Sequence, residues 1–197
     1  MQGGVIDFAP SMEALLVSIG IVTLAEIGDK TQLLTLVLAA RYRKPWPIVA
    51  GIFVATLANH AIAGALGAWL TRVVGPDAMR WILGLSFLAM AAWMLVPDKL
   101  GDDEATGKTR GGIFVSTTIL FFLVEIGDKT QIATVALAAR FDSLAQVVMG
   151  TTIGMILANA PVAFFGDALA KRLPVRAVHA VAAAVFALLG IGVLVFG

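Results

Sequence analysis

One seven-residue motif, Glu-Ile-Gly-Asp-Lys-Thr-Gln, occurs twice in the chain, at 26–32 and again, without a change, at 125–131. Each copy carries two carboxylates three residues apart, and on a helix this spacing places both on one face. Carboxylate oxygens are the ligands that hard divalent cations such as Ca²⁺, Mn²⁺ and Mg²⁺ prefer. We therefore expect the two copies to bind a cation through the four acids Glu26, Asp29, Glu125 and Asp128.

The motifs also contain polar side chains that are expected to support these acids. Lys30 follows Glu26 by four residues, and Lys129 follows Glu125 in the same way, which is a suitable spacing for an ion pair on a helix. The two lysines either supply counter-charge alone or also gate the site. Further candidates for completing the site are Thr31, Gln32, Asn59, Thr130, Gln131 and Asn159.

Asn59 and Asn159 occupy matching positions in the two halves of the chain, and each either completes the site or forms a hydrogen bond between helices. His60 adjoins Asn59 but has no counterpart, because Ala160 stands at the matching position. The simpler interpretation of His60 is a histidine packed among its neighbours, and the alternative is a proton relay.

A glycine lies inside each motif, at Gly28 and Gly127. Glycine in the middle of a helix is unfavourable, by about 1 kcal/mol relative to alanine. It lets the backbone open, which would turn carbonyl oxygens toward a cation, or it lets another helix approach closely. The sequence leaves both interpretations open.

The elements that must hold these residues are membrane helices. Of the 197 residues 59% are hydrophobic and only 14% are charged, against about 25% in a typical soluble domain, and the mean hydropathy is +0.94. A helix needs about 20 apolar residues to cross the hydrocarbon core. We therefore expect an all-α integral membrane protein with six transmembrane helices, and no ordinary soluble enzyme. The expected spans are 12–40, 47–70, 79–96, 112–139, 144–170 and 174–196.

Charge and cysteine content exclude several other classes of protein. The net charge is +1, and no basic patch alternates with aromatic residues, so a nucleic acid is not expected as a partner. The chain has no cysteine, which excludes disulfides, iron–sulfur clusters and thiolate metal sites. We expect no resident cofactor.

The similarity between the two halves extends beyond the motif. Leu-Ala-Asn at 57–59 recurs at 157–159, one residue beyond the offset of 99 that separates the two motifs. Each half therefore contains three helices, and two halves with an odd number of helices insert in opposite directions. This predicts two inverted three-helix repeats, residues 1–97 and 112–197, joined by a cytoplasmic linker at 98–111.

The basic residues set the expected orientation of the chain. The loops after the first, third and fifth helices carry nine lysines and arginines, while the opposite side carries three. Cytoplasmic loops are enriched in lysine and arginine. We therefore place the side with nine in the cytoplasm and both chain ends outside, with the protein in the inner cell membrane.

The cost of burying charge supports a functional role for the motifs. Six ionisable side chains near the middle of membrane segments cost on the order of 15 kcal/mol before any pairing is counted. Four carboxylates and two ammonium groups leave a net charge of −2, which one divalent cation would balance. When the cation leaves, the carboxylates would repel one another and take up protons. The motifs thus predict a cation/proton antiporter, with a cation channel as the alternative.

With its two copies of Glu-Ile-Gly-Asp-Lys-Thr, the chain resembles a family of divalent cation/proton antiporters that carry two E-x-G-D-[KR]-[ST] motifs in six-helix inverted repeats. The family includes bacterial manganese exporters and the Golgi and chloroplast calcium/manganese transporters, and it is related to the lysine-exporter superfamily. The resemblance covers nearly the whole chain. It implies export of Mn²⁺ or Ca²⁺ from the cytoplasm in exchange for protons, and it implies that the four motif acids bind the ion.

Two other functions fit part of the pattern. An intramembrane lipid-pyrophosphate phosphatase would also use acidic motifs in inverted repeats, but it needs an arginine near the acids, and Arg41 and Arg140 lie away from the midplane. An exporter of a basic amino acid would suit the net charge, but no apolar-walled pocket follows from the sequence. We therefore expect a secondary transporter that uses alternating access and is not an enzyme. Both motifs lie in one chain, so a monomer in the lipid bilayer could complete the site.

Overall fold

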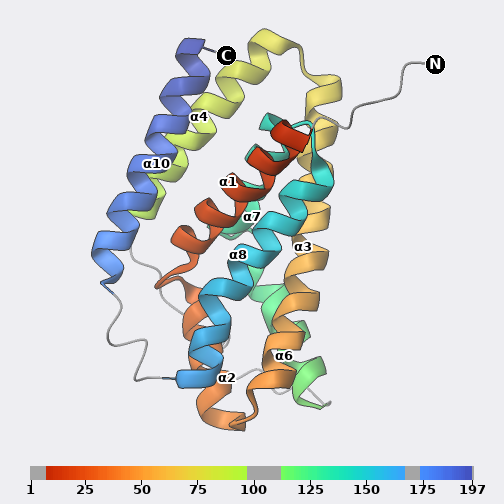
Figure 1. Ribbon diagram of the computed structural model, residues 1–197, viewed down its shortest axis with the longest axis vertical. Helices are drawn as coiled ribbons and strands as arrows, with labels where there is room; N and C mark the ends of the chain where they lie inside the picture. Colours follow the sequence, from red (N-terminus) through yellow and green to blue (C-terminus); the bar gives the residue numbers. More distant parts are fainter. Residues whose placement is uncertain (1–7, 97–111, 167–173, 197) are drawn as a thin grey trace, which may run out of the picture.

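The computed structural model describes residues 8–96, 112–166 and 174–196, and every regular element within these ranges is a helix. The all-α class expected from the sequence is therefore confirmed for this part of the chain (Figure 1). In chain order the helices are α1 (Phe8–Glu26), α2 (Lys30–Tyr42), α3 (Pro45–Val73), α4 (Pro76–Met94), α6 (Ile113–Glu125), α7 (Lys129–Arg140), α8 (Leu144–Phe165) and α10 (Val175–Phe196).

Two of the expected membrane segments are interrupted rather than continuous. The segment expected at 12–40 consists of α1 and α2, and the segment expected at 112–139 consists of α6 and α7. In both segments the helix stops at the glutamate of the motif and resumes at the lysine. The helical spacing assumed for the motif residues therefore fails at both places, and each motif forms a short break between two helices.

The glycine of each motif explains where the helix stops. Gly28 has a φ of +84° and Gly127 a φ of +75°, and side chains other than glycine rarely adopt this conformation. Opening of the backbone is thus confirmed at both glycines. Another helix approaches closely at Gly28, where a Cβ atom would collide with Val175 at the start of α10, whereas none of the described residues has an atom within 4 Å of a Cβ at Gly127.

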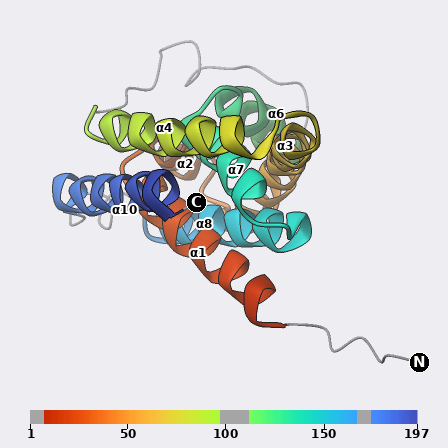
Figure 2. The same ribbon diagram turned by 90° about the horizontal axis from the view of Figure 1, so that it is seen from above.

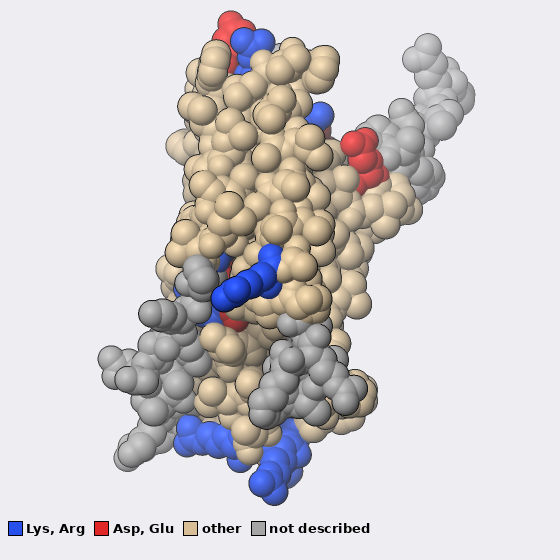
Figure 3. Space-filling model, turned by 90° about the vertical axis from the view of Figure 1, so that its left-hand side faces the viewer, with Lys and Arg blue, Asp and Glu red and all other residues tan. Residues whose placement is uncertain are grey.

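The surface and the long helices suit a membrane. The helices α3, α8 and α10 are long and apolar enough to cross one, and α6 is a shorter apolar helix. Large hydrophobic side chains remain exposed, among them Trp46 at 73% and Phe165 at 71%. Figure 3 shows lysine and arginine at the lower end of one face, with others near its middle and at its upper end, while most of that face is uncharged. Lipid would favour such a surface, and water would not.

The helices of the two halves are interleaved. Helix α1 packs against α8, and α3 packs against both α6 and α7, so each interrupted segment lies on a long helix of the other half. Helices α4 and α10 lie side by side, as Figures 1 and 2 show. In Figure 1, α1 and α2 run toward the lower end, while α6 and α7 run toward the upper end.

Buried apolar side chains form two clusters, and the breaks connect them. One cluster comes mainly from α1, α4, α7 and α10, and the other mainly from α2, α3, α6 and α8. The first break leads from α1 in one cluster to α2 in the other, and the second break leads from α6 to α7 in the reverse direction. The polar motifs therefore lie where the apolar packing changes from one cluster to the other. The expected linker at 98–111 lies outside the described residues.

Candidate cation site

The break in each motif is a tight turn. In the first motif the Asp29 N–H donates to the Glu26 carbonyl at 3.1 Å, and in the second the Asp128 N–H donates to the Glu125 carbonyl at 3.1 Å. Ile126 has φ −63° and ψ 120°, and with the positive φ of the following glycine this is the pattern of a type II turn. The turn places the glutamate at the end of one helix and the aspartate at the N-cap of the next.

The glutamine of each motif fixes its turn. Gln32 Oε1 accepts the Gly28 N–H at 2.8 Å, and Gln131 Oε1 accepts the Gly127 N–H at 2.7 Å. Gln32 also donates from Nε2 to the Ala158 carbonyl of α8 at 3.0 Å. The glutamines expected to support the site therefore hold the backbone at the breaks, and Gln32 also anchors its break to the other half of the chain.

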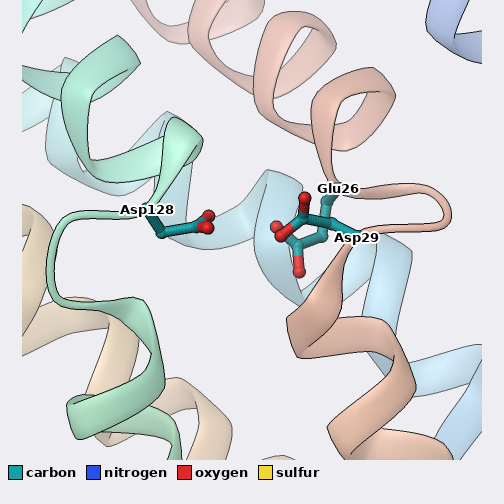
Figure 4. A group of neighbouring side chains, drawn as sticks. All are labelled: Glu26, Asp29 and Asp128. Atoms are coloured by element: carbon teal, nitrogen blue, oxygen red, sulfur yellow. The ribbon is translucent and has the colours of Figure 1, made fainter. Parts of the chain in front are cut away.

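Three of the four predicted acids form one buried group. Glu26, Asp29 and Asp128 are 0%, 0% and 2% exposed, and a carboxylate oxygen from each lies within 4.8 Å of those from the other two. Figure 4 shows the three carboxylates converging from the two breaks. We call these residues the three-carboxylate cluster. Two carboxylates at this distance repel each other by about 3.5 kcal/mol at an effective dielectric constant of about 20, so the cluster attracts a cation.

The fourth acid, Glu125, lies outside this cluster and has its own set of contacts, mainly with α3. Its Oε2 accepts a hydrogen bond from Asn59 Nδ2 at 3.1 Å and one from the Thr56 hydroxyl at 3.5 Å. Its Oε1 lies 3.1 Å from His60 Nε2. Glu125 and Asp128 were expected to share one helical face, but the turn between them separates their roles. Sequence reasoning missed Thr56, although its position three residues before Asn59 puts it on the same side of α3.

The lysines pair between the motifs rather than within them. Lys30 Nζ lies 3.3 Å from Asp128 Oδ1, and Lys129 Nζ lies 3.6 Å from Asp29 Oδ1. The spacing of Lys30 and Glu26 favoured a pair on one helix, and that expectation was wrong because the helix ends between the two residues. Each lysine instead supplies counter-charge to the aspartate of the other half.

The two asparagines also connect the halves. Asn159 Nδ2 on α8 donates to Glu26 Oε1 at 3.1 Å, in the same way that Asn59 on α3 donates to Glu125. Asn159 Oδ1 accepts from the Thr35 hydroxyl at 2.6 Å. The hydrogen bond between helices is therefore confirmed for both asparagines, and in each case the acceptor is a motif acid.

The two threonines of the motifs differ in their partners. Thr130 donates to Asp128 Oδ2 from its N–H at 3.4 Å and from its hydroxyl at 3.1 Å, which caps the start of α7. The hydroxyl of Thr31 is buried and has no hydrogen-bond partner within the described residues. The Glu26 Oε2 atom is in the same situation. Buried oxygens that lack a donor are available to a cation.

His179 on α10 contacts the first break, although nothing in the sequence singled this residue out. A ring nitrogen of His179 on α10 lies 2.6 Å from the carbonyl oxygen of Ile27, inside the first break. Together with Val175 against Gly28, this contact packs the first turn of α10 onto the first break. No sequence signal linked His179 to the motif, because the two are 152 positions apart.

The chemistry of the assembled residues is that of a site for a hard divalent cation. The cluster offers carboxylate oxygens, and the Thr31 hydroxyl of the same motif is buried without a hydrogen-bond partner among the described residues. Such donors suit Mn²⁺, Ca²⁺ and Mg²⁺. Arg41 and Arg140, which a phosphate-binding enzyme would need beside the acids, are both exposed instead.

Comparison with known proteins agrees with this chemistry. A sequence model of the family described as "Divalent cation/proton antiporter GDT1" matches residues 14–102 and 113–197. A protein of Vibrio cholerae serotype O1 named "Putative manganese exporter" is 50% identical over 200 residues, which cover 100% of this chain and 99% of the relative.

More distant relatives come from plants and cyanobacteria. "GDT1-like protein 3" of Arabidopsis thaliana is 28% identical over 90% of this chain and 69% of its own length. "GDT1-like protein sll0615" of Synechocystis is 31% identical over 70% of this chain and 77% of its own length. No solved structure matches the chain.

Proposed function

The chain belongs to the GDT1 family of divalent cation/proton antiporters, which are transporters and not enzymes, and we propose that it exports Mn²⁺ or Ca²⁺ from the cytoplasm in exchange for protons. The observation that carries the proposal is the three-carboxylate cluster, in which Glu26 and Asp29 from one motif meet Asp128 from the other. The name of the Vibrio cholerae relative supports Mn²⁺ as the exported ion.

Charge balance explains why a divalent ion would enter. The three carboxylates of the cluster face the ammonium groups of Lys30 and Lys129, so the cluster keeps a negative charge that a cation neutralises. Glu125, which the family motif includes among the acids, adds a fourth carboxylate nearby. Exit of the cation restores the repulsion among buried carboxylates, and protons relieve that repulsion by neutralising them. This exchange of one cation for protons is the proposed coupling.

The same geometry supports an inverted repeat in the membrane. We assign the six spans to α1 with α2, α3, α4, α6 with α7, α8, and α10. The opposite directions of α1–α2 and α6–α7 in Figure 1 support two inverted repeats, residues 1–97 and 112–197, joined by a cytoplasmic linker at 98–111. The basic residues support an inner-membrane orientation with both chain ends outside.

Alternating access would use the contacts between the repeats. Each break is held by residues of the other half, through the two lysine–aspartate pairs and the two asparagine–glutamate bonds. A rigid movement of one repeat against the other changes all four contacts together and exposes the cluster to the opposite side. One chain supplies every residue of this arrangement, so a monomer suffices.

Transport of purified protein in proteoliposomes tests the proposal. Uptake of Mn²⁺, Ca²⁺ and Mg²⁺ is compared while a dye reports the internal pH. We expect Mn²⁺ or Ca²⁺ flux to be accompanied by proton movement in the opposite direction. Metal flux without proton movement would instead indicate the cation channel, and flux of neither ion would refute the proposal.

A pair of matched variants tests the site. Glu26→Gln removes one carboxylate of the cluster at nearly constant volume, and it should abolish metal flux without loss of folded protein. Glu13→Gln makes the same chemical change at an exposed position of the same helix and should retain wild-type flux. Wild-type flux in Glu26→Gln would remove the cluster from the mechanism.

A further inference from the structure

A second polar pair lies beside the cluster and is not used by it. His60 Nε2 lies 3.1 Å from Glu125 Oε1, and both side chains are 0% exposed. Within the described residues neither atom forms a hydrogen bond of acceptable geometry. The other carboxylate oxygen of Glu125 is held by Asn59 and Thr56. Glu125 is therefore fixed in place while its Oε1 and the imidazole nitrogen remain available to a ligand.

His60 Nε2 and Glu125 Oε1 offer a metal ion one nitrogen and one oxygen, whereas the three-carboxylate cluster offers oxygen alone. The three-carboxylate cluster offers oxygen, which Ca²⁺ and Mg²⁺ accept as readily as Mn²⁺ does. A neutral imidazole nitrogen suits first-row transition metals, whereas Ca²⁺ and Mg²⁺ bind to oxygen ligands. A nitrogen and an oxygen that are buried together can therefore distinguish Mn²⁺ from Ca²⁺.

Comparison of the two halves shows that the repeat itself does not require a histidine here. Asn159 donates to Glu26 as Asn59 donates to Glu125, so the repeat supplies the same asparagine contact to both glutamates. Ala160 follows Asn159, however, where His60 follows Asn59. Alanine thus occupies the matching, half-buried position of the other half, and the imidazole of His60 is an addition to one half.

We propose that His60 Nε2 and Glu125 Oε1 form a second cation subsite, which favours Mn²⁺ over Ca²⁺. The inference rests on the proposed transport function and adds the residue that sets ion choice. A histidine that only positioned Glu125 would change the transport of both ions by the same factor. A histidine that binds the ion changes their ratio.

The flux ratio in proteoliposomes separates these two roles. His60→Gln replaces the imidazole by an amide of similar polarity, and the ratio of Mn²⁺ to Ca²⁺ flux should fall by about tenfold. The matched control is Thr56→Val, which removes a hydrogen bond to Glu125 without removing the nitrogen, and it should lower both fluxes alike. Equal losses of both ions in His60→Gln would overturn the proposal. A wild-type protein that carried neither ion would instead refute the transport function itself.

Pulsed electron paramagnetic resonance of Mn²⁺ bound to the purified wild-type protein gives an independent test. We expect nitrogen coupling from a directly bound imidazole. The chain has only two histidines, so the coupling should disappear in His60→Gln and persist in His179→Gln. Absence of nitrogen coupling in the wild-type protein at saturating Mn²⁺ would overturn the proposal, whether or not the His60 variant folds.

Discussion

Lys30 Nζ lies 3.3 Å from Asp128 Oδ1, so the lysine of the first motif is paired with an acid of the second. The reciprocal contact joins Lys129 to Asp29. The lysines therefore occupy the same carboxylates that a cation would use, and they compete with it. Because both pairs cross from one half to the other, a movement that separates the two breaks disrupts both pairs together.

This competition predicts the effect of removing one ammonium group. Two unit charges about 4 Å apart interact by about 1–4 kcal/mol at effective dielectric constants of about 80 to 20. At the lower end of this range, about 1 kcal/mol, Lys30→Gln should bind Mn²⁺ about fivefold more tightly. Release of the ion should become slower, so the maximal flux should fall while the KM for Mn²⁺ also falls. Calorimetric titration of the purified protein and initial rates in proteoliposomes measure the two effects.

The matched control for Lys30 is Lys44→Gln, at an exposed lysine of the turn that follows α2. It should change neither the affinity nor the flux. Weaker Mn²⁺ binding in Lys30→Gln would show that the lysine assembles the cluster rather than competing for it.

The two glycines should respond differently to substitution by alanine. Both have positive φ, so alanine costs about 1–2 kcal/mol of backbone strain at either position. At Gly28 the new Cβ also collides with Val175, while at Gly127 it meets no atom of the described residues within 4 Å. Thermal unfolding in detergent should therefore show a larger loss of stability for Gly28→Ala than for Gly127→Ala.

A double variant isolates the collision from the strain. Val175→Ala removes the side chain that the Cβ at position 28 would meet, so it should recover part of the stability lost in Gly28→Ala. The double variant should then resemble Gly127→Ala. Equal losses in the two single glycine variants would mean that α10 does not press on the first break.

The limits of the sequence interpretation follow from the turn geometry. The repeat and its acids are visible in the sequence, since an identical motif and matching flanks need no structure to be recognised. Helical spacing, however, was the wrong rule at the two breaks. The i, i+3 and i, i+4 relationships assume an uninterrupted helix, whereas glycine at positive φ ends it between Glu26 and Lys30.

The side-chain contacts between distant segments also could not be predicted from the sequence. The partner of Lys30 is an aspartate almost 100 positions away, and the site of Glu125 is completed by α3. Nothing local to either motif indicates these pairings. Inversion of the repeat would bring the two breaks together, but only coordinates identify which acid meets which lysine.

The bond from Asn159 to Glu26 should matter for binding as well as for stability. Asn159→Leu keeps the branched shape of the side chain but removes the donor to Glu26 Oε1, and loss of a hydrogen bond to a charged group costs about 1.5–3 kcal/mol. We expect a lower unfolding temperature and weaker Mn²⁺ binding in a titration. Asn159→Ser retains a donor at the position and should fall between Leu and the wild type. Equal losses of stability and of Mn²⁺ binding in the Ser and Leu variants would mean that Asn159 acts by filling space and not by its hydrogen bond to Glu26.

The inverted topology can be tested with single cysteines, because the chain has no cysteine of its own. Lys44 lies in the turn between α2 and α3, and Asp142 lies in the matching turn between α7 and α8 of the other half. Both residues are exposed. Inversion of the repeats puts the two turns on opposite sides of the membrane, with Lys44 in the cytoplasm on the basis of its basic neighbours.

A membrane-impermeant thiol reagent should therefore modify Lys44→Cys in inside-out vesicles and Asp142→Cys in right-side-out vesicles. Each variant should be protected in vesicles of the other orientation until detergent is added. Modification of both cysteines from one side would contradict the inverted repeat, because two parallel repeats would place matching turns together. Modification of Asp142→Cys in inside-out vesicles and of Lys44→Cys in right-side-out vesicles would support the inverted repeat but reverse the proposed orientation. The experiment therefore tests the repeat and the orientation separately.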